Sequence, residues 1–140
     1  MRKSIGRKKS IRLESPGLAK LLGLRLISAG KNRVRGRMPW SSRIVQRNGI
    51  IHGGALAALA DSTGGVGAIK LAGPGRRVVT VEMKINYFSN TSSGWVYSDA
   101  RLLHQGSTSS VWEIRLYSGA GRRCLLALAV ASYVTASGAP

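Results

Sequence analysis

Apolar and polar residues alternate most regularly over residues 79–87. An extended strand there would carry on one face Val79, Val81, Met83, Ile85 and Tyr87, and on the other Thr80, Glu82, Lys84 and Asn86. Three further stretches of strand character lie at residues 95–104, 109–118 and 123–134, separated by glycine-containing turns. The pattern predicts four consecutive antiparallel strands.

A run of Ala and Leu residues precedes these strands and predicts a long helix over residues 53–70. Glycine inside a helix costs up to ~1 kcal/mol relative to alanine. We therefore expect close packing under a sheet to be the use of three glycines in this segment, Gly64, Gly65 and Gly67.

The residues before the long helix predict a short helix and two strands. Ser15 and Pro16 are typical of a helix start, here of a helix over residues 17–22. Residues 24–28 and 34–40 have strand character. The order of elements predicts an α+β fold in which a curved antiparallel sheet wraps around one long central helix.

At 140 residues the chain is long enough for one domain with a buried core, which we expect over residues 13–140, after a disordered basic arm at residues 1–12. The only cysteine, Cys124, rules out an internal disulfide and fits a reducing compartment, so we expect a cytoplasmic location. No apolar run reaches the ~20 residues that span a bilayer. No secretory signal is expected, whereas an organellar presequence at residues 2–12 stays open.

Positive charge is concentrated at the start of the chain. Residues 1–47 hold 14 of the 22 Lys and Arg residues and 1 of the 5 acids. The other 8 basic residues and 4 acids lie in residues 48–140. The first third is therefore +13 and the rest +4. Such a surface attracts polyanions, among them coenzyme A and nucleic acid, although a solvated tail explains the first basic residues equally well.

One acid differs from the others in its surroundings. Asp61 interrupts a continuous Ala and Leu segment, whereas polar or alternating sequence surrounds Glu14, Glu82, Asp99 and Glu113. A carboxylate that loses hydration is either paired or chemically poised. An incidental Asp on the wet side of a core helix explains the spacing equally well.

The turn His52-Gly53-Gly54 begins the predicted helix eight residues before Asp61. Amide N–H groups of the first helical turn, with the positive end of the helix dipole, suit an oxygen that gains negative charge. Eight residues at ~1.5 Å each separate Gly53 from Asp61 by ~12 Å, yet a reacting carbonyl lies within ~3–3.5 Å of its attacker. A site that uses both groups therefore needs two subunits.

Residues 52–61 and 79–87 together resemble the signature of the hotdog-fold thioesterases, in particular the phenylacetate-degradation (PaaI-like) branch. The similarity runs from about Leu22 to Val134. It implies a hotdog fold and an acyl-CoA thioesterase without cofactor or metal, built as a dimer through the 79–87 strand and expected to form a tetramer. Asp61 would be the base or nucleophile.

The same resemblance assigns further roles around the site. The Gly53 amide would be the oxyanion donor, His52 and Gly54 would help position the thioester, and the Thr80 hydroxyl would lie near the carboxylate and its water. The family often has Asn where this chain has Gln46; either Gln46 or Asn48 would then position the water. For the CoA phosphates the chain offers Arg76 and Arg77.

Other functions fit the sequence less well. A non-catalytic module that binds acyl-CoA or a polyanion is the main alternative, but the basic arm has no interleaved aromatics, so no nucleic-acid partner is expected. A hydratase of the same fold would need a different arrangement of His and acid. His52 and His104 are the only histidines, with no Cys/His cluster for a metal, and no G-x-S-x-G nucleophile motif occurs.

Overall fold

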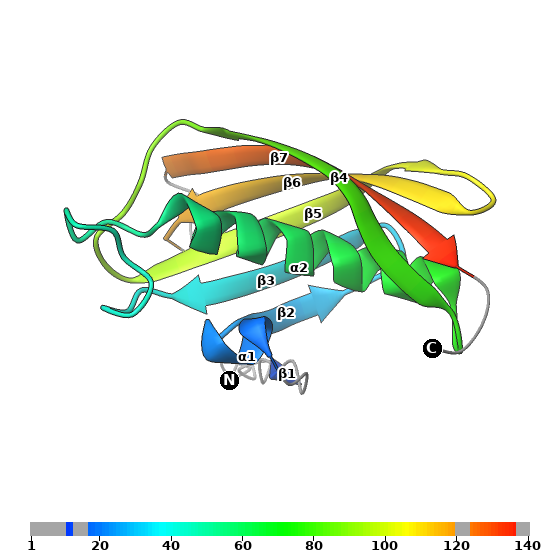
Figure 1. Ribbon diagram of the computed structural model, residues 1–140, viewed down its shortest axis with the longest axis horizontal. Helices are drawn as coiled ribbons and strands as arrows, with labels where there is room; N and C mark the ends of the chain where they lie inside the picture. Colours follow the sequence, from blue (N-terminus) through cyan, green and yellow to red (C-terminus); the bar gives the residue numbers. More distant parts are fainter. Residues whose placement is uncertain (1–10, 13–16, 120–123, 137–140) are drawn as a thin grey trace, which may run out of the picture.

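The computed structural model describes residues 11–12, 17–119 and 124–136. A single antiparallel sheet of seven strands curves around one long helix, α2 (Gly53–Ala72) (Figure 1). The remaining elements are α1 (Leu18–Leu21), β1 (Ile11–Arg12), β2 (Arg25–Ala29), β3 (Arg33–Pro39), β4 (Arg77–Tyr87), β5 (Trp95–Gln105), β6 (Ser109–Ser118) and β7 (Cys124–Ala136). The strand order is β1-β2-β3-β5-β6-β7-β4, which leaves β4 at an edge.

The expected α+β architecture is confirmed, with differences at the beginning of the chain. Residues 1–10 of the expected disordered arm lie outside the described residues, but at Ile11 and Arg12 the expectation is wrong, because these residues pair with β2. The helix start expected at Ser15 and Pro16 also lies outside the described residues. Helix α1 is a single turn after Gly17.

The predicted alternation of β4 is wrong at its centre. Thr80 pairs with Tyr133 and Glu82 with Ser132, so Val81 is an extra residue in a β-bulge. Because of this extra residue, the side chains before and after Val81 do not follow one regular alternation between the two faces of the sheet. Thr80 faces the helix, as the hydrogen bond from Thr80 Oγ1 to Asp61 Oδ1 shows, whereas Val81 is 59% exposed.

The core lies between α2 and the inner face of the sheet, where glycines and alanines let the two layers approach closely. A Cβ on Gly67 would lie 2.4 Å from the fully buried Trp112 ring, and one on Gly64 would lie 2.4 Å from the Tyr133 hydroxyl. Ala127, Ala129 and Ala131 line the same face of β7. The expected use of the helix glycines is confirmed for Gly64 and Gly67; Gly65 makes only an ordinary contact at 3.7 Å.

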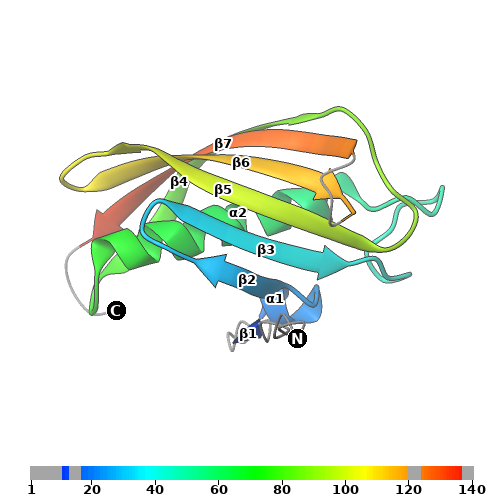
Figure 2. The same cartoon turned by 180° about the vertical axis from the view of Figure 1, so that it is seen from behind.

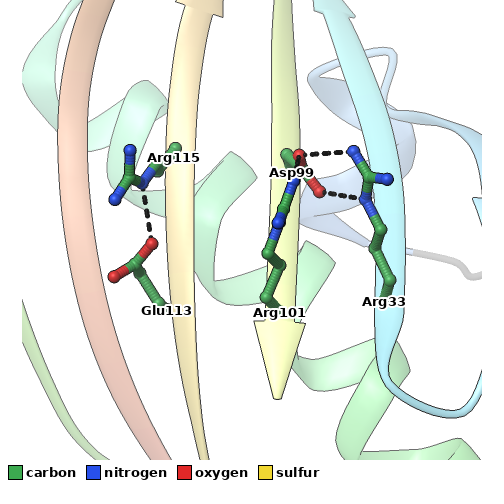
Figure 3. A network of polar contacts seen from close by, with 5 residues as sticks. All are labelled: Arg33, Asp99, Arg101, Glu113 and Arg115. Carbon is green, nitrogen blue, oxygen red and sulfur yellow. Dashed lines mark hydrogen bonds and ion pairs between the residues drawn. The ribbon is translucent and has the colours of Figure 1, made fainter. Parts of the chain in front are cut away.

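The outer face of the sheet, turned away from α2 (Figure 2), carries the one acid that is buried among the residues that the structure describes. Asp99 is 4% exposed, and its carboxylate accepts two hydrogen bonds of 2.8 Å from Arg33 and lies 3.4 Å from Arg101 (Figure 3). The hydrogen bond to Asp99 raises the pKa of Arg33. Glu113 and Arg115 form a second pair at 2.7 Å. Of the acids in the described residues, Asp99 is therefore the most buried, and its ion pairs join β3 and β5.

Strand β4 crosses in front of α2 in the view of Figure 1, and its outer edge pairs with no other strand of the described residues. Large apolar side chains are exposed on and just after it: Val79, Val81, Tyr87 and Phe88. A long edge strand with exposed apolar residues is a template for pairing with another chain.

Candidate active site

The backbone before α2 is held on both sides, which fixes the His52-Gly53-Gly54 turn. The His52 amide donates to the Ile44 carbonyl at 2.8 Å, and the Ile51 amide donates to Thr91 at 3.2 Å. His52 is the N-cap of the helix, with its Nδ1 atom accepting the Gly54 amide at 2.8 Å. Histidine thus takes the capping role that Ser, Thr, Asp or Asn usually fills.

This cap fixes the chemistry of the imidazole. Because Nδ1 accepts a hydrogen bond, the proton of the neutral ring is on Nε2. His52 is exposed, so Nε2–H is available as a donor. The side chain can therefore polarise a carbonyl oxygen, but in this arrangement it cannot act as a base through Nε2.

The two glycine amides have different surroundings. The Gly54 amide is used by His52, whereas the Gly53 amide has no acceptor among the residues that the structure describes. The Gly53 carbonyl accepts a hydrogen bond of 2.9 Å from the Tyr87 hydroxyl, which ties the turn to β4. Burial raises the pKa of Tyr87, so the phenol stays a donor. The free Gly53 amide is the one that can meet a ligand oxygen.

Asp61 lies two helical turns further along α2 and is half-buried rather than desolvated. The Thr80 hydroxyl donates to its Oδ1 atom at 2.8 Å. The sequence paired these two residues only through a family resemblance. The structure brings them together.

Sequence reasoning missed Tyr133 on β7. Its hydroxyl donates to the Asp61 backbone carbonyl at 2.9 Å and lies 3.4 Å from Asp61 Oδ1. Burial, followed by the negative charge of Asp61, raises the pKa of Tyr133 far above its usual range. The other buried residues of β7 are Leu126 and three alanines, so a tyrosine among them was the available signal.

A pocket of about 250 Å³ adjoins the capped turn. Its walls come from α1, the loop before α2 and the first turns of α2: Leu18, Leu22, Arg43, Ile44, Val45, His52, Gly54, Ala55 and Ala58. Most of this lining is apolar, and Arg43 is its only Lys or Arg among the described residues. Such a pocket suits an apolar group attached to a carbonyl at Gly53.

The other predicted site residues are not all brought together within one chain. Gln46 and Asn48 are exposed in a tight loop closed by the Val45–Ile51 bridge, and neither side chain has a hydrogen-bond partner among the described residues. Arg76 and Arg77 follow the far end of α2, whose 20 residues span ~30 Å. They lie at the opposite end of the helix from the His52 turn.

Over the residues that the structure describes, no group of three or more His, Cys, Asp or Glu side chains is arranged to hold a metal ion. No helix in the described ranges is long and apolar enough to cross a membrane.

Residues 48–125, which span α2 to the start of β7, match the thioesterase superfamily. The chain belongs to this superfamily. The proofreading thioesterase EntH of Klebsiella pneumoniae is 40% identical over 87 residues, 62% of this chain and 64% of that protein. EntH of Cronobacter turicensis is 35% identical over 107 residues, 76% of this chain and 78% of that protein.

Members named for hydrolysis of CoA esters are similar as well. The 1,4-dihydroxy-2-naphthoyl-CoA hydrolase of Escherichia coli is 33% identical over 103 residues, 74% of this chain and 76% of that protein. These relationships identify the chain as a thioester hydrolase, which is the enzyme class expected from the sequence.

Solved structures of the superfamily share the fold. A conserved protein of Pseudomonas aeruginosa superposes with a TM-score of 0.79 at 34% identity, over 84% of this chain and 92% of that one. The PaaI protein of the Escherichia coli phenylacetic acid degradation operon superposes with a TM-score of 0.78 at 22% identity, over 86% of this chain and 84% of that one. The expected hotdog thioesterase fold is confirmed, and the expected resemblance to PaaI is confirmed at the level of the fold.

Proposed function

We propose that the chain hydrolyses acyl-CoA thioesters, with Asp61 as base or nucleophile and the Gly53 amide as oxyanion donor. One observation carries the proposal: the Gly53 amide is free beside the exposed Nε2–H of a capped His52, while Thr80 holds the Asp61 carboxylate further along the same helix. Two donors at one end and an oriented carboxylate at the other are the groups that acyl transfer needs.

The two ends act on one substrate only if they come from different subunits. Gly53 and Asp61 are eight residues apart on α2, or ~12 Å at ~1.5 Å per residue. The unpaired edge of β4, with its exposed valines, supports pairing between two copies of the chain. A dimer through β4 would form two equivalent sites, each with Gly53 of one subunit and Asp61 of the other. A tetramer of such dimers is our expectation for the full assembly.

Hydrolysis then follows one of two routes. As a base, Asp61 takes a proton from water while the hydroxide oxygen bonds to the thioester carbon. As a nucleophile, it bonds to that carbon itself and forms an anhydride that water later opens. In both routes the carbonyl oxygen becomes an anion held by the Gly53 amide and His52 Nε2–H. The C–S bond breaks as the carbonyl reforms, and the CoA thiolate takes up a proton.

The volume of the pocket beside the turn favours a substrate with a small acyl group. A dry protein cavity of ~150 Å³ holds benzene, whereas pockets for drug-sized ligands are ~300–1,000 Å³. The pocket here, at about 250 Å³, lies between them and suits a single ring or a short chain. An aromatic acyl group is also part of the substrate named for the Escherichia coli relative.

Polar and basic residues outside the pocket would position the attacking water and bind the phosphates of CoA. Gln46 stands at the base of the loop before α2 and Asn48 at its tip, so we propose that Gln46 positions the water. Across a dimer, Arg76 and Arg77 of one subunit would be available to the CoA phosphates. The net charge of +17 would favour capture of that anionic substrate.

A panel of acyl-CoAs assayed by release of free CoA thiol tests the proposal. The unaltered chain should turn over at least one small acyl-CoA, and Asp61→Asn should lower kcat by ~10²–10⁴, the scale of a positioned acid–base group. Thr80→Ala, which keeps the carboxylate, should cost less. Near-full activity of Asp61→Asn on every substrate would disprove the mechanism. Acyl-CoA binding without turnover by the unaltered chain would instead favour a non-catalytic binding module.

A further inference from the structure

Two hydroxyl groups of the sheet approach the same oxygen of Asp61. Thr80 Oγ1 donates to Oδ1 at 2.8 Å, and the Tyr133 hydroxyl lies 3.4 Å from that same atom. Neither hydroxyl, nor any other side chain that the structure describes, donates to Oδ2. The two carboxylate oxygens therefore have different surroundings.

Tyr133 is held more firmly than a surface hydroxyl would be. It is 2% exposed, and it pairs directly with Thr80 across β7 and β4, so that both hydroxyls come from one cross-strand pair. Gly64 makes room for it: a Cβ there would lie 2.4 Å from the hydroxyl and 3.1 Å from the ring carbon that bears it. The hydroxyl donates to the Asp61 carbonyl at 2.9 Å, which fixes the backbone from which the carboxylate projects.

We propose that Tyr133 is a positioning residue for the reaction, which together with Thr80 occupies Asp61 Oδ1 and leaves Oδ2 as the oxygen that meets water or the thioester. This inference rests on the proposed role of Asp61. Tyr133 touches no substrate in this arrangement. It acts by limiting the carboxylate to one rotamer, so its contribution belongs to the chemical step rather than to binding.

The direction from which a nucleophile attacks a carbonyl carbon tolerates little displacement, since a misplacement of ~1 Å can lower the rate ~10²-fold. The net effect of a single lost hydrogen bond corresponds to a factor of about 2 to 12. Loss of the Tyr133 hydroxyl should accordingly lower kcat by about tenfold, the upper end of that scale. KM should stay within about twofold, because the acyl pocket and the Gly53 donor are unchanged.

The test uses Tyr133→Phe in the full chain, with Tyr97→Phe as the matched control. Tyr97 is a half-buried tyrosine on β5. Its neighbours in sequence, Val96 and Ser98, are buried against the core, so Tyr97 lies on the other face of the sheet. We expect Tyr133→Phe to lower kcat about tenfold at constant KM and Tyr97→Phe to leave both unchanged. An unchanged kcat, or a loss confined to KM, would overturn the inference.

A double variant separates positioning from general damage to the fold. If Tyr133 acts through Asp61, then Tyr133→Phe should cause no further loss in single turnovers of Asp61→Asn. An equal loss in both backgrounds would show that the effect does not pass through Asp61. Full activity of Asp61→Asn alone would instead refute the proposed function, which distinguishes the two failures.

Gly64→Ala provides a second approach should Tyr133→Phe fold poorly. Its Cβ would lie 2.4 Å from the hydroxyl and 3.1 Å from the ring carbon that bears it, so the phenol has to shift as a unit away from its place beside Asp61. We expect a several-fold lower kcat for Gly64→Ala in the parent chain at constant KM, judged on protein whose folding is verified by circular dichroism. A folded Gly64→Ala variant with unchanged kcat would count against Tyr133 as a positioning residue.

Discussion

The Gly54 amide donates a hydrogen bond to His52 Nδ1 at 2.8 Å, so one side chain both caps α2 and presents Nε2–H to the solvent. The cap uses the amide of Gly54, whereas that of Gly53 meets no acceptor in the part of the chain that the structure describes. Helix stability and the proposed oxyanion binding therefore depend on the same imidazole. Substitutions can separate the two roles.

His52→Asn should keep the cap and lose the donor. Asparagine is a good N-cap, whereas alanine in this position costs ~1 kcal/mol of stability. We expect His52→Asn to unfold near the parent midpoint in urea, and His52→Ala to be less stable by about that amount. Both should lose turnover of acyl-CoA by a similar factor of ~10²–10³, the scale of one oxyanion donor. Parent-like kcat in His52→Asn would show that Nε2–H takes no part.

Gly67 and Gly65 should respond to alanine in opposite directions. A Cβ on Gly67 would lie 2.4 to 2.7 Å from three atoms of the Trp112 ring, which is fully buried and cannot move aside. Overpacking of this kind costs ~1–3 kcal/mol, so Gly67→Ala should be destabilised. Gly65 is half-buried with nothing closer than 3.7 Å, and its alanine variant should gain up to ~1 kcal/mol of helix stability. Urea unfolding of both variants measures the difference, and a stable Gly67→Ala would contradict the packing.

The parts of the site that lie close together in the chain were predictable, and those that depend on pairing were not. His52 caps α2, and Gly53 and Asp61 lie within it, so composition and spacing made them candidates and the family resemblance supplied their expected roles. Thr80 faces Asp61 only because of the bulge at Val81, and regular alternation placed it on the wrong face. A bulge inserts one extra residue into one strand of a pair, and a regular alternation of apolar and polar residues does not reveal where this happens.

Contacts over long sequence separations escaped prediction for the same reason. Tyr133 reaches Asp61 across 72 positions, and Arg33 reaches Asp99 across 66. Asp99 sits in an alternating strand that gave no sign of burial, yet it is 4% exposed because arginines on β3 and β5 cover it. Knowledge of the strand order is needed before either contact can be inferred.

Val81→Lys should weaken self-association. Val81 is 59% exposed on the unpaired edge strand, and two copies paired there would bring like charges together. Leu103 is a matched control, since it is 56% exposed and is also the extra residue of a bulge, on β5. By light scattering with dilution, Val81→Lys should dissociate at a higher concentration than the parent or Leu103→Lys, and its activity should fall in parallel. A fully active Val81→Lys monomer would exclude a site shared between subunits.

Ala58→Leu should narrow the acyl specificity. Ala58 lines the pocket of about 250 Å³ from the exposed side of α2, so a leucine there fills part of the volume without entering the core. We expect kcat/KM for ring-sized or longer acyl-CoAs to fall at least tenfold while acetyl-CoA or propionyl-CoA hydrolysis changes little. One added methylene in such a pocket discriminates by ~10–200-fold. A uniform loss over all chain lengths would mean that the acyl group binds elsewhere.

The stability of the chain at high pH should depend on Tyr133. Burial and the nearby Asp61 charge raise the pKa of this phenol far above the usual value of 10.0, so the folded chain keeps its proton where the unfolded chain loses it. The contribution is fully present below pH 10 and is lost as pH rises, because unfolding then releases a proton. From pH 10 to pH 11.5, the parent should lose unfolding free energy in urea more steeply than Tyr133→Phe, with an extra slope that rises toward ~1.4 kcal/mol per pH unit as the unfolded tyrosine becomes fully ionised. Parallel slopes for the two proteins would mean that Tyr133 ionises in the folded chain as readily as in the unfolded one, contrary to its burial against Asp61.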